Sequence, residues 1–243
     1  MSADILIYAA VAAGLVFWLK NILGTTHGEE RDRPNPFASA GTDTAETENR
    51  TAGKRIPGDT HDPNNIKAGL AKHMSIATPM TETALMSLTK ADGGFKLSSF
   101  LKAAENAFIL VVEAFAEGDT ETLKELVAQP VYNVFADALK KREEVGESSS
   151  VEIHAVRKTQ VMSTRMEGRM AYITVRFVSD ETNVIRDKEG EVIFGDPDRV
   201  TETIDIWTFG RDIKSKSPVW LVYETRDEDA AEAEEEEKTV PDA

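Results

Sequence analysis

The chain has 243 residues, no cysteine and a formal net charge of −15 at pH 7. The lack of cysteine excludes disulfides, thiolate catalysis and zinc sites built on cysteine. From Glu224 to the end, ten acidic residues face only two basic ones. An acidic chain of this kind is not expected to bind nucleic acid, because phosphate contacts need clustered Lys and Arg.

Residues 1–23 form the most apolar segment of the chain. As a helix, Ile5–Leu23 would be about 28 Å long, close to the roughly 30 Å hydrocarbon core of a bilayer. A cleaved signal peptide is the less favoured alternative, because the segment starts with Asp4 rather than a base and no A-x-A motif follows it. We therefore expect a single-pass anchor. Lys20 and later bases follow the span, which places the remaining chain in the cytoplasm.

Residues 24–65 and residues 226–243 are both predicted to be disordered. The first segment is rich in Thr, Gly, Pro, Asn and charge and has almost no apolar side chains, which is typical of a flexible tether. The second is strongly acidic and is predicted to be a solvated tail, with docking to a basic partner as the alternative.

Residues 66–225 are predicted to form one folded domain, which begins with a weaker helical region over 66–90, interrupted at Pro79. Met74 and Met80 are available for burial there, and several lysines lie between and beside them. The favoured interpretation is that this region packs on its own domain. The alternative is contact with a membrane or a partner.

The clearest helix lies in "LSSFLKAAENAFILVVEAFAEGD", where apolar residues recur at spacings of three and four. Ser98 or Ser99 is expected to cap its start, and Gly118 is expected to end it in a left-handed conformation. Asp119 then caps a short second helix, and Pro130 opens a third. The helical half ends near Gly146 and the serines at 148–150.

After residue 150 the apolar pattern has a period of two. In "RMAYITVRFV", Ala171, Ile173, Val175 and Phe177 are expected to face one way, and the residues between them the other. Strand-like segments separated by turn signals follow up to residue 228. Helices first and antiparallel strands afterwards predict an α+β domain, with helices packed on one face of a curved sheet.

Two long stretches carry a resemblance to a known family. These are "AFAEGDTETLKELVAQPVYNVFADALKKREEVGE" and "YITVRFVSDETNVIRDKEGEVIFGDPDRVTETIDIWTFGRDIKSKSPVWLVYET". They resemble the Tim44-like domain, found in the mitochondrial inner-membrane import-motor tether and in alphaproteobacterial membrane proteins. The resemblance implies a cone of the nuclear-transport-factor-two-like, or cystatin-like, type with a concave pocket. It also implies a bacterial inner-membrane location for this chain.

In the mitochondrial relatives, the resemblance implies recruitment to cardiolipin-containing membrane and an adaptor role between a translocation channel and a chaperone. This chain has "GTTHGEER" directly after the predicted anchor, where bacterial relatives often carry several bases. That departure weakens the expectation of anionic-lipid contact through this segment.

The candidates for lining a ligand or partner pocket are aromatic or acidic residues near the final hairpin and at the third helix: Tyr132, Tyr172, Asp205, Trp207, Phe209 and Trp220. By alternation Asp205, Trp207 and Phe209 share a face. Asp205 beside Trp207, with Tyr172 or Tyr132, is the one catalytic trio that the residues suggest, as in an isomerase or dehydratase. The favoured alternative is that Asp205 pairs with a basic residue on a neighbouring strand, such as Arg176.

No catalytic residue, cofactor site or metal site is expected, because the histidines lack metal-ligand spacing and no phosphate-binding or nucleophile motif is found. We expect a non-enzymatic, membrane-anchored adaptor that contacts inner-membrane lipid and protein partners, in protein translocation or membrane-complex assembly. The first alternative is a protein whose pocket binds a lipid or small ligand. The second is a cone-fold isomerase or dehydratase.

Overall fold

The computed structural model describes residues 35–39 and 66–228. The predicted anchor at 1–23, most of the predicted tether and nearly all of the predicted tail therefore lie outside the described residues. Within the two described ranges, no helix is both long enough and apolar enough to cross a membrane.

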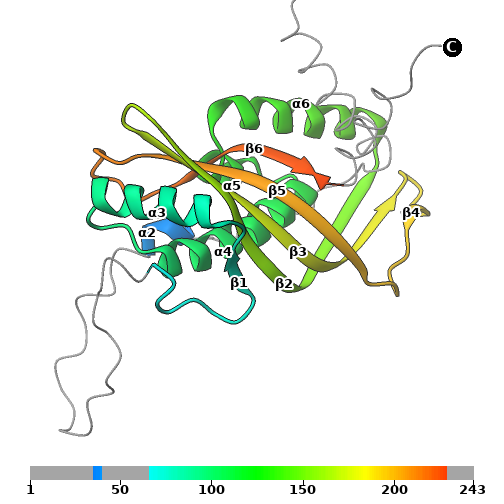
Figure 1. Ribbon diagram of the computed structural model, residues 1–243. Helices are drawn as coiled ribbons and strands as arrows, with labels where there is room; N and C mark the ends of the chain where they lie inside the picture. The colour runs from blue at the N-terminus through cyan, green and yellow to red at the C-terminus, as the bar shows by residue number, and fades with distance from the viewer. Residues whose placement is uncertain (1–34, 40–65, 229–243) are drawn as a thin grey trace, which may run out of the picture.

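Helices occupy the first half of the folded region (Figure 1). They are α2 (Pro36–Ser39), α3 (Pro79–Ala91), α4 (Leu97–Glu117), α5 (Thr120–Leu126) and α6 (Gln129–Val145). The strands are β1 (Met74–Ile76), β2 (Ser148–Glu167), β3 (Met170–Arg186), β4 (Val192–Gly195), β5 (Thr201–Asp212) and β6 (Leu221–Asp227). This arrangement confirms the predicted α+β class.

The strands form one sheet in the order β1-β2-β3-β5-β6, and β4 pairs with β3 beside this path. β1 runs parallel to β2, and the other pairings are antiparallel. The β2–β3 ladder has three shifts of register, between Ile153 and Ala155, between Val156 and Lys158, and after Val161. Irregularities of this kind bend a strand and increase its twist, which curves the sheet around α4.

One face of the sheet, the inner face, packs against α4. Phe108 of α4 stacks on Phe177 of β3 at a ring distance of 4.6 Å. Ala171, Ile173 and Val175 are fully buried on the same face, as the alternating pattern predicts. The opposite, outer face carries the residues between them.

The ends of α4 follow the predicted signals in part. Gly118 closes the helix with a φ of 78°, a left-handed conformation that favours glycine. Asp119 then caps α5 by accepting a hydrogen bond of 3.0 Å from the Thr122 amide. The prediction of a serine cap at the start was wrong, because α4 begins at Leu97 and its cap position, Lys96, makes no side-chain cap bond.

α6 begins with Pro130 in its first turn and ends at Gly146, both as predicted. β2 starts at once, at Ser148, so the serines predicted to end the helical half open a strand. Arg142, in the last turn of α6, is buried, and its guanidinium donates to the carbonyl oxygens of Phe115 and Ala116. These two bonds hold α6 against the end of α4.

The region 66–90 differs from its prediction as a helix interrupted at Pro79. Pro79 opens α3 instead, and the Thr78 side chain caps that helix by accepting from the Thr81 amide at 3.1 Å. The three residues Met74–Ile76, upstream of Pro79, form β1. The sequence pattern did not indicate this strand because it is so short. Met74 is buried, whereas Met80 is 82% exposed.

The predicted disordered tether, 24–65, contains a segment that is folded. Residues 36–39 form α2, and Phe37 is only 2% exposed because it is part of the core. The prediction was therefore wrong at these residues. Figure 1 shows α2 (blue) close to the helical layer, where it contacts α4.

Candidate functional site

The aromatic pocket candidates on β5 are packed into the inner face. Trp207 meets Phe108 edge to face at 5.0 Å, and Phe209 meets Phe100 in the same way at 5.7 Å. Both candidates are buried. Edge-to-face aromatic pairs of this kind stabilise a core beyond the area that they bury. On this face, therefore, the protein's own side chains occupy the space that a cone pocket would offer.

Trp220, just before β6, belongs to the same aromatic cluster. Its ring lies 4.9 Å from Phe100 and 6.0 Å from Phe95. The Arg211 guanidinium lies over the ring at 5.1 Å and forms an ion pair with Asp92 after α3. Trp220 is thus packed between the helical layer and the hairpin, and its contacts hold the two together.

Asp205 lies on the inner face with Trp207 and Phe209, as predicted from alternation. Its carboxylate accepts a hydrogen bond of 3.3 Å from the Trp207 indole. Burial, reinforced by the negative charge of Glu181, raises the pKa of Asp205 to about 7. The predicted partner, Arg176, lies on the outer face and binds Glu228 instead, so that prediction was wrong.

The tyrosines proposed to complete a catalytic trio are not beside Asp205. Tyr172 is on the outer face, where its ring meets Tyr223 edge to face at 5.4 Å and the Arg165 guanidinium at 4.4 Å. Tyr132 lies in the first turn of α6, under the Lys124 ammonium at 5.8 Å. Asp205 and Trp207 are therefore in contact, but neither tyrosine joins them in the proposed acid–base site.

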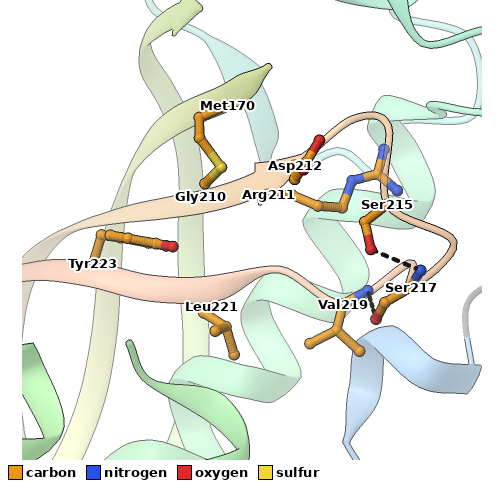
Figure 2. Close-up of a pocket in the computed structure, with 9 residues that line it drawn as sticks. All are labelled: Met170, Gly210, Arg211, Asp212, Ser215, Ser217, Val219, Leu221 and Tyr223. Carbon is orange, nitrogen blue, oxygen red and sulfur yellow. Dashed lines mark hydrogen bonds between the residues drawn. The ribbon is translucent and has the colours of Figure 1, made fainter. Parts of the chain in front are cut away.

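A shallow pocket of about 260 Å³ lies on the outer face beside the β5–β6 hairpin (Figure 2). Its lining is Met170, Gly210, Arg211, Asp212, Ser215, Ser217, Val219, Leu221 and Tyr223. The hairpin loop is ordered by two short-range bonds, from the Ser217 amide to the Ser215 hydroxyl at 3.1 Å and from the Val219 amide to the Ser217 hydroxyl at 3.3 Å.

Gly210 makes the packing beside this pocket possible. A Cβ at this position would lie 2.6 Å from the Tyr223 ring and 2.9 Å from the Tyr172 ring. Only glycine lets both rings lie against the β5 backbone. A glycine within a strand pattern is a signal of close approach, so Gly210 could have pointed to this pocket from the sequence.

A second surface that the sequence did not reveal is the hairpin formed by the end of β3 and β4, with the turn that follows it. We call the exposed apolar residues here the β4 wing, namely Val192, Ile193, Phe194 and Val200. Gly195, with a φ of 76°, closes the strand where a Cβ would meet the Asn183 carbonyl at 1.9 Å. The pattern "EVIFG" predicts a strand, but it does not indicate that the side chains on both faces of this strand are exposed.

Among the described residues, no group of three or more His, Asp or Glu side chains is arranged to hold a metal ion. The arrangement therefore combines a closely packed inner face, a shallow outer pocket and an exposed apolar wing.

The family model of the Tim44-like domain matches residues 81–227, from α3 to the end of β6. This chain belongs to the Tim44-like domain family. The match covers nearly all of the helical layer and of the sheet, so the Tim44-like domain makes up most of the described residues.

Curated relatives of this Tim44-like chain are mitochondrial. The mitochondrial import inner membrane translocase subunit TIM44 of Homo sapiens is 27% identical over 142 residues, which cover 58% of this chain and 31% of the relative. The probable subunit tin-44 of Caenorhabditis elegans is 24% identical over 144 residues, covering 58% and 34%. The chain thus spans about a third of the length of these relatives.

Two solved structures show more distant likeness, each at 18% identity. The intermembrane space region of the chloroplast protein ARC6 has a TM-score of 0.38, over 52% of this chain and 95% of that one. A ketosteroid isomerase-like protein from Erwinia carotovora atroseptica has a TM-score of 0.26, over 51% and 92%. Scores this low leave the sequence match as the basis of the family assignment.

Proposed function

We propose that this protein is a non-enzymatic, membrane-associated scaffold in protein translocation. The observation that carries the proposal is the family match over residues 81–227, which spans nearly all of the folded domain. The curated relatives are named as subunits of a mitochondrial inner membrane translocase. We further propose that the predicted anchor at 1–23 holds the domain at the bacterial inner membrane, on the cytoplasmic side.

A non-enzymatic role is supported by the position of the side chains that chemistry would need. Asp205 has a pKa close to neutrality, which suits a general base. Tyr172, however, is on the other face of the sheet, and Tyr132 contacts Lys124 on the helical layer. Neither tyrosine is therefore placed to stabilise a charge that develops during catalysis beside Asp205.

The β4 wing is the surface that we propose for the protein partner. Three exposed apolar side chains lie there on a short strand and Val200 lies just before β5, and large apolar side chains gathered on a surface mark interaction sites. A strand at the edge of a sheet also presents unpaired backbone groups to a partner. The acids Glu191, Asp196 and Asp198 flank the wing, so a protein suits it better than anionic lipid.

The test is affinity purification of the full chain from detergent-solubilised membranes. The wild-type chain and the control Val145→Ser, an equally exposed apolar residue on α6, are expected to recover the same membrane proteins. The double variant Ile193→Ser, Phe194→Ser is expected to lose them at unchanged stability. Recovery of the wild-type chain with lipid alone and no protein would contradict the scaffold function.

A second candidate, binding of a small apolar ligand, is favoured by the outer pocket with Met170, Val219 and Leu221 in its lining. At about 260 Å³ the pocket lies below the usual range of ligand sites, about 300–1,000 Å³. Native mass spectrometry of the purified chain tests this candidate. A stoichiometric bound lipid that disappears in Leu221→Trp would support it, and a chain without adducts would contradict it.

A further inference from the structure

The segment Asn35–Ser39 reaches the folded domain from outside it, because residues 40–65 separate the two described ranges. Its one large apolar side chain, Phe37, is almost completely buried. The ring stacks on Phe100 of α4 at 6.1 Å and meets Phe209 of β5 edge to face at 5.9 Å. A single aromatic ring from an upstream segment thus lies between α4 and β5, and we call the space that it occupies the groove.

Asn35 makes the second contact with the domain. Its side-chain amide donates a hydrogen bond of 2.8 Å to the carbonyl oxygen of Glu125. Glu125 lies in the last turn of α5, where carbonyl groups have no donor within their own helix. The groove therefore offers an apolar space and, beside it, an acceptor that helix geometry leaves open.

The tripeptide Asn35-Pro36-Phe37 is shaped for these two contacts. The Asn35 side-chain oxygen accepts from the Phe37 amide at 3.0 Å, and the Asn35 carbonyl accepts from the Ala38 amide at 3.0 Å. Pro36 fixes the backbone angle at the start of this turn. The turn directs the asparagine amide and the phenyl ring toward the domain at the same time. Each of the three residues therefore has a separate role.

We propose that this groove is a binding site for short peptides of the form Asn-Pro-aromatic, and that the chain's own segment occupies it as a displaceable latch. The latch covers Phe100 and Phe209, the two rings that a peptide in this groove would contact in its place. The proposal rests on the scaffold function in one respect, that the displacing peptide belongs to a partner protein. Because the latch is tethered, its effective concentration is on the order of millimolar, and a free peptide must compete with it.

The experiment uses the full chain in nanodiscs and a fluorescent peptide with the sequence of residues 33–41, RPNPFASAG. Fluorescence anisotropy measures peptide binding to the wild type and to Phe37→Ala, which empties the groove. The Phe37→Ala chain is expected to bind the peptide at least about tenfold more tightly than the wild type, because no latch competes. Control peptides carrying Phe37→Ala or Asn35→Ala should bind at least about fivefold more weakly than the native peptide.

The proposal is overturned if a folded Phe37→Ala chain, with a cooperative thermal transition, binds the native and control peptides equally. Should Phe37→Ala fail to fold, Asn35→Ala chains supply the test, since loss of one hydrogen bond should increase peptide binding about fivefold over the wild type. No increase there also overturns the proposal. Concentration-dependent dimers of the wild type would show exchange of the segment between copies, and would overturn the latch within one chain.

Failure here is distinguishable from failure of the scaffold function. The peptide assay contains the chain in nanodiscs and a peptide but no partner protein, and it does not involve the β4 wing. If the chain recovers its membrane partners through the wing but does not bind the peptide, the scaffold function is supported and the latch is contradicted.

Discussion

Similar apolar side chains are buried on the inner face under α4 and exposed in the β4 wing. Phe108 and Phe177 are fully buried and stacked against each other. Ile193 and Phe194 are exposed on a hairpin that extends away from the helical layer. The sequence predicts a strand in both regions, and the difference arises from which strands a helix covers. Apolar residues hold the fold together in the first region, and in the second they are available to a partner.

The largest expected effect on stability is at the inner face, where truncating a buried ring should cost far more than truncating an exposed one. Phe108→Ala removes a ring packed between Phe177 and Trp207, and it should lower the free energy of unfolding by about 3–5 kcal/mol. The matched change in the wing, Phe194→Ala, should cost less than about 0.5 kcal/mol. Urea denaturation followed by circular dichroism measures both. Equal losses would show that the wing belongs to the core.

The next effect concerns the buried guanidinium of α6. Arg142→Met keeps the volume but removes the donor to the Ala116 carbonyl at the end of α4. We expect a loss of about 1–3 kcal/mol, because a buried acceptor is left without its donor. Lys141→Met, on the exposed side of the same turn, is the control and should be nearly neutral. The same denaturation measurement applies, and a neutral Arg142→Met would contradict this role.

The third prediction uses pH to probe the inner face. The pKa of Asp205 is about 7 in the folded protein, against about 3.9 for an unfolded aspartate. The folded state therefore binds more protons between these values, and stability falls as pH rises through this window. The loss from pH 5 to pH 8 is roughly 2 kcal/mol. Above pH 8 this contribution is constant.

Asp205→Asn should flatten this part of the pH dependence and stabilise the protein at pH 8 but not at pH 5. Thermal unfolding across this pH range measures the effect. Glu191→Gln, an acid-to-amide change in the exposed wing, should leave the dependence as in the wild type. A wild-type stability that is constant from pH 5 to pH 8 would disprove the raised pKa of Asp205.

The smallest effect tests the outer face. Gly210→Ala would press a methyl group onto the Tyr172 and Tyr223 rings, and overpacking of this kind costs about 1–2 kcal/mol. Gly93→Ala, where a Cβ meets nothing within 4 Å, should be neutral. Differential scanning calorimetry compares the two variants. A neutral Gly210→Ala would mean that the tyrosine rings can move aside.

Regular periodicity made much of this fold predictable. The face shared by Phe100 and Phe108, the glycine at the end of α4 and the alternation from Ala171 to Phe177 each depend on near neighbours in the chain. Local physics sets these features, so the helices, the strands and the α+β class follow from the sequence. The family resemblance was confirmed by the match over residues 81–227.

Features that depend on distant contacts were not predictable. Phe37 stands alone in a polar segment, and its burial depends on a groove formed by residues far along the chain. Arg142 looks like an ordinary surface base until α6 is packed against the end of α4. The pairing of Arg176 with Glu228, in place of Asp205, follows from the face that each strand residue takes.

The central claim, that the domain is a scaffold with its partner at the β4 wing, is tested most directly by photocrosslinking. A benzophenone side chain is placed at Phe194 or, as control, at Tyr223 on the outer face, and intact membranes are irradiated. The account predicts discrete protein adducts from position 194 and none of the same size from position 223. Adducts to lipid alone from position 194, or no adduct at all, would contradict it.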